Sequence, residues 1–204
     1  MFITLDGSDG CGKSTQIQRL AERLQSQGHK VVCCRDPGGT PLGDAVRNIL
    51  LNRGELQIAD TTEVFLFSAA RAQLVQEVIR PALENGSIVL SDRFLISTLV
   101  YQCYAGGVPI EMLKSISAAS VGETLPDLSI VLDIPYEIAV ERIRHRSTPD
   151  RMERKGEEYH RLVREGFLKY AAEEPQRYVV VDAAPPPDEV ANAIWKIVFQ
   201  ADKT

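Results

Sequence analysis

The residues best suited to chemistry lie near the start of the 204-residue chain. The run Gly7-Ser8-Asp9-Gly10-Cys11-Gly12-Lys13-Ser14 fits the pattern G-x-x-x-x-G-K-[ST] at every fixed position. Glycines let the backbone curl so that several N–H groups face one anion, and a following helix adds the positive end of its dipole. In such a loop the lysine, here Lys13, reaches the β- and γ-phosphates, and the hydroxyl of Ser14 can hold Mg²⁺. The motif therefore predicts that the chain binds a nucleoside triphosphate.

The sequence leaves two uses open for the γ-phosphate. A guanine-nucleotide switch needs an N-K-x-D segment, which the sequence lacks. The run D-P-G-G at 36–39 spells the D-x-x-G of such switches, but we interpret it as a turn because it is rich in glycine and proline. Transfer to a second small substrate would require a second phosphate site built from arginines. An ATP-driven switch that binds a protein partner would have no need of one.

Arginine is the favoured cation of this chain, with 16 Arg against 7 Lys. Its planar fork binds phosphate through two hydrogen bonds at once. Arg35 and Arg93 follow predicted strands, and Arg142, Arg144 and Arg146 form a dense cluster. The cluster is either a solvated basic surface or the start of a mobile lid over about 142–153 that closes on the phosphates.

Hydrophobic periodicity indicates the elements that must position these residues. Short β-branched runs alternate with helical patterns, which is typical of a parallel sheet covered by helices. The expected strands cover 2–5, 31–34, 88–90, 130–132 and 179–181. The expected helices include 13–27, 41–51 and a long one over 61–85. We therefore predict one α/β domain over 1–204 with a five-stranded parallel sheet, whose ligands lie at the carboxyl ends of the strands.

Composition excludes several other classes of protein. Hydrophobic residues make up 44% of the chain and charged residues 25%, as in an ordinary globular domain. A net charge of −5 argues against a nucleic-acid-binding surface, and the apolar runs are too short to span a membrane. The first residues show no signal peptide, so we expect a cytoplasmic chain. Its four cysteines are then reduced thiols: Cys11, Cys33, Cys34 and Cys103.

Taken in order, five segments resemble the bacterial thymidylate kinases, a family of nucleoside monophosphate kinases. The resemblance covers nearly the whole chain. The segment 6–15, which ends at Thr15, is similar to the family's phosphate loop with its acidic residue at Asp9. R-D-P-G-G-T at 35–40 resembles R-E-P-G-G-T, with Asp36 in place of Glu, and L-F-S-A-A-R at 66–71 resembles F-x-A-x-R. The other two are D-R-F at 92–94 with its following Ser97 and Tyr101-Gln102, and the segment 142–153, which resembles the lid.

The resemblance implies a P-loop fold and the reaction ATP + dTMP → ADP + dTDP, with Mg²⁺. Another monophosphate or deoxynucleoside kinase, or an ATP-driven switch, remains the alternative. Family members are usually homodimers, so a homodimer is expected here; from the composition we expect neither a nucleic-acid nor a membrane partner. The implied acceptor-site roles are stacking of Phe67 on thymine, and contacts of Arg71, Ser97 and Gln102 to or near the base edge. Tyr101 would lie against the sugar, Asp9 would bind the 3′-hydroxyl, and the acceptor phosphate would contact Arg93, Arg35 and Arg47.

The resemblance also implies where catalysis lies. The variable positions of the phosphate loop hold no arginine, so the arginine that stabilises the transferring group is expected in the lid. Arg144 or Arg146 is the expected residue, with Arg142 on the ATP side and Arg151 an outside candidate. Lys13, Arg93 and Asp9 complete the catalytic set, and Ser14 and Asp92 are the expected metal ligands. Asp36 is one methylene shorter than the usual Glu, so we expect its contact in the acceptor site to be either rearranged or bridged by water.

Overall fold

The structure is a computed structural model that describes residues 1–51, 56–144 and 151–201. Its centre is a parallel sheet of five strands in the order β2-β3-β1-β4-β5. The strands are β1 (Phe2–Gly7), β2 (Val31–Arg35), β3 (Ile88–Asp92), β4 (Leu128–Asp133) and β5 (Tyr178–Asp182). The five-stranded parallel sheet predicted from the sequence is confirmed, and each strand extends the expected run by one to three residues.

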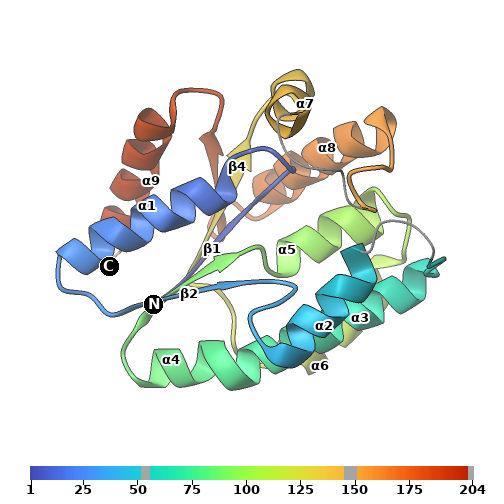
Figure 1. Cartoon of the computed structure of the whole chain (residues 1–204), viewed down its shortest axis with the longest axis horizontal. Coiled ribbons are helices and arrows are strands. Elements are labelled where there is room, and N and C mark those ends of the chain that lie inside the picture. Colours follow the sequence, from blue (N-terminus) through green and yellow to red (C-terminus); the bar gives the residue numbers. More distant parts are fainter. Residues whose placement is uncertain (52–55, 145–150, 202–204) are drawn as a thin grey trace.

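Helices cover both faces of this sheet (Figure 1). In chain order they are α1 (Lys13–Ser26), α2 (Pro41–Leu51), α3 (Asp60–Leu74), α4 (Arg80–Glu84), α5 (Leu95–Thr98), α6 (Ile110–Val121), α7 (Tyr136–Arg144), α8 (Glu157–Glu173) and α9 (Pro187–Ala201). Two π-helical segments interrupt the series, η1 (Val75–Ile79) and η2 (Leu99–Tyr104). None of the helices in the described ranges has the length and apolarity that crossing a bilayer requires.

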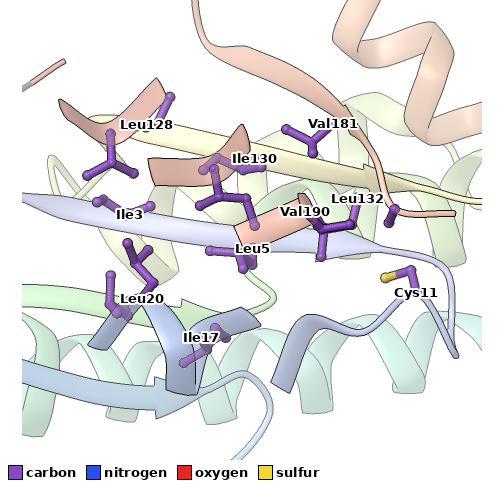
Figure 2. Close-up of a cluster of buried hydrophobic side chains, with 14 of the residues drawn as sticks. Ile3, Leu5, Cys11, Ile17, Leu20, Leu128, Ile130, Leu132, Val181 and Val190 are labelled. Atoms are coloured by element: carbon purple, nitrogen blue, oxygen red, sulfur yellow. The ribbon is translucent and has the colours of Figure 1, made fainter. Parts of the chain in front are cut away.

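The core on the α1 and α9 face is built from alternate residues of the central strands. Ile3 and Leu5 of β1 point toward Ile17 and Leu20 of α1, with Val190 of α9 beside them (Figure 2). Because side chains alternate along a strand, the residues between them face the other way. On the opposite face, separate buried clusters pack residues of the strands against the helical segments α3, η1, η2 and α8.

The predicted helix over 61–85 is present, but it is not α-helical throughout. Its path runs through α3, η1 and α4, with the π-helical turn just before Pro81. Proline cannot donate a hydrogen bond to the carbonyl four residues earlier, and its ring clashes with that carbonyl in a regular α-helix. The wider turn of η1 precedes this position, as a single π-helical turn within a longer helical run.

Candidate active site

The phosphate loop joins β1 to α1 and depends on glycines with left-handed backbone angles. Gly7 has φ 136°, and a Cβ placed there would lie 2.4 Å from the carbonyl oxygen of Leu132 on β4. Gly12 has φ 96° and immediately precedes α1. Lys13 is buried, and its Nζ donates hydrogen bonds to the carbonyl oxygens of Gly7 at 3.2 Å and Ser8 at 3.0 Å. The loop therefore positions the Lys13 side chain at the N-terminus of α1.

The two predicted metal ligands meet beside this loop. Ser14 Oγ donates a hydrogen bond to Asp92 Oδ2 at 3.0 Å. Their proximity follows from the topology, because Asp92 ends β3 and pairs with Leu5 of the neighbouring β1. A hydroxyl and a carboxylate oxygen are hard donors of the kind that Mg²⁺ takes alongside waters and phosphate oxygens. The donor set fits this metal.

Arg93 lies between the phosphate loop and the predicted acceptor-site residues Ser97 and Tyr101. It follows β3 with φ 70°, a left-handed conformation that is uncommon for a residue with a side chain and that clusters at functional sites. Its guanidinium donates to the Gly7 carbonyl oxygen at 2.9 Å, Asp9 Oδ1 at 2.5 Å, Ser97 Oγ at 3.1 Å and the Tyr101 hydroxyl at 3.0 Å. Arg93 is thus in direct contact with four other predicted site residues.

The carboxylate of Asp9 is kept ionised by this arrangement. Burial on its own would raise the pKa of Asp9, but the charges of Arg93 and Lys13 and the hydrogen bond from Tyr101 lower it to about 2. A charged hydrogen-bond acceptor therefore stands beside the phosphate loop over the whole physiological pH range.

Asp6 supports the turn that carries Arg93. It is fully buried at the end of β1, and its Oδ1 accepts hydrogen bonds from the Phe94 amide at 3.2 Å and Ser97 Oγ at 2.6 Å. Burial raises the pKa of Asp6, although these hydrogen bonds and Arg93 act in the opposite direction. Its place at the end of a buried strand, one residue before the phosphate loop, is the sequence signal that could have singled it out.

A cavity beside Arg93 brings together most of the predicted acceptor residues. It is lined by Asp9, Asp36, Pro37, Arg47, Leu51, Phe67, Arg71, Arg93, Ser97, Thr98, Tyr101, Gln102 and Met152. Phe67 contributes a half-buried ring from α3, and Arg47 also donates to the Pro37 carbonyl oxygen at 3.0 Å. Thr98 and Met152 were not singled out from the sequence, and no chemical pattern marks either of them there.

Arg71 is buried in the wall of this cavity and is oriented by two partners. Its Nε donates to Asp36 Oδ2 at 2.5 Å, and its Nη2 donates to Thr98 Oγ1 at 2.6 Å. The remaining nitrogen, Nη1, is buried without a partner among the described residues. Asp36, which the sequence places in the acceptor site, therefore touches Arg71 directly, and Arg71 retains one donor for a ligand.

A polar cleft connects the cavity to the phosphate loop. Asp9, Asp36, Arg47 and Arg93 line both, and the cleft adds Gly10, Gly12, Lys13, Ser14, Arg35, Asp92 and Glu153. Arg35 lies at this cleft rather than in the cavity, and its Nη2 pairs with the half-exposed Asp44 at 2.9 Å. The two spaces form one continuous site, and two arginines and two aspartates line their junction.

The lid segment is described at its two ends only. Arg142 on α7 donates to the carbonyl oxygens of Ala183 and Ala184, which follow β5, at 3.0 and 3.1 Å. Arg151, at the other end, donates to the Leu50 carbonyl oxygen at 2.8 Å and pairs with Glu63. Arg146 and the side chain of Arg144 lie outside the described residues.

Glu63 is a buried carboxylate that the sequence predictions did not include. It belongs to α3, pairs with Arg151 and accepts a hydrogen bond from Gln102 Nε2 at 2.8 Å. Its position could have been noticed, since Glu63, Phe67 and Arg71 are spaced four residues apart and share one helix face. A buried acidic residue on the face that carries two ligand-binding candidates is rarely there for packing alone.

Comparisons with known proteins place the chain in a family. The family model described as thymidylate kinase matches residues 5–194. The chain belongs to the thymidylate kinase family. It is 46% identical to the thymidylate kinase of Deinococcus radiodurans over 98% of this chain and 97% of that protein. It is also 46% identical to that of Symbiobacterium thermophilum, over 97% and 92% of the two chains.

A solved structure extends the agreement to three dimensions. The crystal structure of thymidylate kinase from Ehrlichia chaffeensis superposes with a TM-score of 0.77 at 30% sequence identity, covering 97% of this chain and 98% of that one. The P-loop nucleoside monophosphate kinase fold expected from the sequence is therefore confirmed. Membership of the thymidylate kinase family makes the chain a phosphotransferase that takes ATP as phosphoryl donor.

Proposed function

We propose that the chain transfers the γ-phosphoryl group of ATP to dTMP, giving ADP and dTDP. The observation that carries this function is the continuity of the site. A phosphate loop and a base-sized cavity with an aromatic wall open into one another at Asp9 and Arg93. A protein switch has no use for the second cavity, so that alternative is not favoured.

The donor nucleotide is proposed to occupy the loop over 7–15. Lys13 exchanges its hydrogen bonds to backbone carbonyls for bonds to the β- and γ-phosphates. Ser14 and Asp92 would hold Mg²⁺, which when bound neutralises charge on the phosphates. Arg142 fixes the segment after β5 through two carbonyl oxygens, and that segment is the expected adenine side of the site.

The acceptor is proposed to enter the cavity with its base against Phe67. An aromatic ring gives a flat base a large stacking contact at low entropic cost. The unpartnered Nη1 of Arg71 is a donor suited to a carbonyl oxygen of the base, such as O4 of thymine. Gln102 and Ser97 are further polar groups in the cavity, and Tyr101 stands beside Asp9, where the sugar would lie.

Phosphoryl transfer then needs alignment and charge neutralisation rather than a general base. A phosphate monoester is already mostly dianionic at neutral pH, so its oxygen can attack directly. A bond forms from that oxygen to Pγ while the bond from Pγ to the β-bridging oxygen breaks, and ADP leaves. Arg93, Arg47 and Arg35 lie along the cleft to hold the acceptor phosphate, and Arg144 or Arg146 of the lid would stabilise the transferring group.

We further propose a cytoplasmic homodimer. The four cysteines are all free thiols, which suits a reducing compartment. The packed pair α2 and α3 exposes large apolar side chains, with Leu42 49%, Ile49 42% and Phe65 53% accessible. Covering these side chains with a second copy would remove apolar surface from water. Sedimentation of the wild type and of Phe65→Glu tests this: dimers that persist unchanged in the variant would exclude this face.

The reaction is tested by identifying the products. Purified protein is incubated with Mg·ATP and dTMP, and nucleotides are separated by chromatography. We expect dTDP and ADP to appear in equal amounts, with little ADP when dTMP is left out. ADP formed at the same rate without dTMP would make the chain an ATPase and contradict the proposed function.

A further inference from the structure

The side chain of Gln102 is held by Glu63, a residue outside the cavity lining whose carboxylate can only accept hydrogen bonds. Its Nε2 donates to Glu63 Oε1 at 2.8 Å, and both side chains are almost fully buried. The second carboxylate oxygen of Glu63 pairs with Arg151, and Lys155 Nζ lies 3.9 Å from the first. In this ion pair Glu63 is a carboxylate, with lone pairs and no proton to donate.

The partner fixes which end of the Gln102 amide meets a ligand. An amide presents NH₂ at one end and a carbonyl oxygen at the other, and the two ends are similar in size. Because Glu63 can satisfy only the NH₂ end, the carbonyl oxygen Oε1 is the end left for the cavity that Gln102 lines. Among the described residues, no hydrogen bond is made to that oxygen.

We infer that Glu63 is a positioning residue for base specificity: it orients the Gln102 amide so that the cavity offers an acceptor to N3–H of thymine and rejects cytosine. The inference rests on the proposed function. Glu63 lies behind Gln102 rather than in the cavity wall, so it acts through Gln102 and not by touching the nucleotide.

The hydrogen-bonding edges of the two pyrimidines explain the discrimination. Thymine presents a donor at N3–H beside an acceptor at O4, whereas cytosine presents an acceptor at N3 beside a donor at its amino group. The cavity offers a donor at Arg71 Nη1 and an acceptor at Gln102 Oε1, which matches thymine at both positions. With cytosine, the amino group would face the donor of Arg71, and N3 would face the acceptor of Gln102. Buried polar groups would then lack hydrogen bonds, which costs more binding free energy than a mismatch between apolar groups.

Substitution of Glu63 by Gln should turn the Gln102 amide over. The guanidinium of Arg151 demands an acceptor, so it would take the new amide oxygen at position 63. The new NH₂ would then face Gln102, whose own oxygen must turn to receive it. The cavity would present an NH₂ group to the base, which suits N3 of cytosine and opposes N3–H of thymine.

The test measures kcat/KM for dTMP, dUMP and dCMP with Mg·ATP in the wild type and in Glu63→Gln. Loss of one hydrogen bond to a buried group corresponds to about tenfold. We expect kcat/KM for dTMP to fall about tenfold and the dCMP:dTMP ratio to rise at least about tenfold. The dTMP:dUMP ratio should stay within about twofold, because both bases carry the same N3–H. Unselective loss of activity on all three would contradict the inference.

A double-mutant cycle separates orientation from a general structural role. In a Gln102→Leu background no amide remains to turn, so adding Glu63→Gln should leave the dCMP:dTMP ratio unchanged. An equal rise in both backgrounds would overturn the inference.

Glu63→Asp is the second variant, because it keeps the charge but draws the carboxylate back beyond hydrogen-bond reach of Gln102. Glu63→Asp should also raise the dCMP:dTMP ratio. If Glu63→Gln does not fold, this variant alone tests whether Glu63 orients the Gln102 amide. Failure of the proposed function would differ from all these results, since the wild type itself would then not favour dTMP.

Discussion

Arg93 Nη2 lies 2.5 Å from Asp9 Oδ1, so an ion pair joins the turn after β3 to the phosphate loop after β1. The Tyr101 hydroxyl accepts a hydrogen bond from Arg93 and donates one to Asp9, which closes a triangle of three side chains. The triangle stands where the donor cleft and the acceptor cavity meet. We therefore expect a change to one member to affect both of the proposed nucleotide sites.

Acid stability tests this ion pair. The pKa of Asp9 falls from 3.8 to about 2 on folding, so the unfolded chain binds that proton more tightly. The resulting stabilisation is complete above about pH 4 and is lost as the pH falls toward 2. Arg93→Gln should lower the free energy of unfolding at pH 7 by about 2 kcal/mol and flatten its rise between pH 2 and 4. Denaturant unfolding at several pH values measures this, with Arg177→Gln, which breaks an exposed pair with Glu174, as the control. Identical pH profiles for Arg93→Gln and wild type would contradict it.

Removal of the Phe67 ring should weaken binding of the acceptor alone. Stacking of a base on an aromatic side chain contributes about 1–3 kcal/mol. We therefore expect Phe67→Ala to raise KM for dTMP about tenfold to a hundredfold and to change KM for ATP little. Phe199→Ala removes a ring of α9 that stacks on Trp195, outside the cavity, and is the matched control. A larger rise in KM for ATP than in KM for dTMP would show that the thymine base does not stack on Phe67.

The pair of Ser14 and Asp92 predicts the metal requirement. Ser14→Ala removes a hydroxyl oxygen donor, and Asp92→Asn removes the negative charge of a carboxylate. The free Mg²⁺ needed for half-maximal rate should therefore rise about tenfold in each variant, in line with the loss of one charge-assisted contact. Ser26→Ala removes an exposed hydroxyl that donates to the Arg23 carbonyl oxygen and should leave the requirement unchanged. The assay is a Mg²⁺ titration at fixed ATP. An unaltered midpoint in both site variants would remove these residues from the metal site.

A lid arginine should act on the chemical step rather than on binding. Arginines that stabilise a transferring phosphoryl group are worth about 10³–10⁵ in kcat. One of Arg144→Ala and Arg146→Ala is expected to lose activity on this scale with little change in KM for either nucleotide. Arg161→Ala serves as the control, because Arg161 pairs at the surface with Glu137 and Glu157. Full activity in both lid variants would show that the stabilising charge comes from another residue.

Local patterns were enough to predict the sheet and the phosphate loop. Each strand is a short β-branched run, and the glycines of the loop are required by backbone angles that their spacing already indicates. Pairwise tertiary contacts were not predictable in the same way. The partners of Arg71 lie 35 and 27 residues away along the chain, at Asp36 and Thr98, and no local pattern joins them.

Phosphoryl transfer from ATP to dTMP is tested most directly by a comparison of acceptors. ADP formation is measured with Mg·ATP and, in separate reactions, dTMP, dUMP, dCMP, CMP, AMP, GMP and free thymidine. We expect rapid turnover of dTMP, slower turnover of dUMP and almost none of the others. Preference for a different monophosphate would keep the fold and the phosphate loop but contradict the roles proposed for Phe67, Arg71 and Gln102. If no acceptor stimulated ADP release, phosphoryl transfer itself would be contradicted.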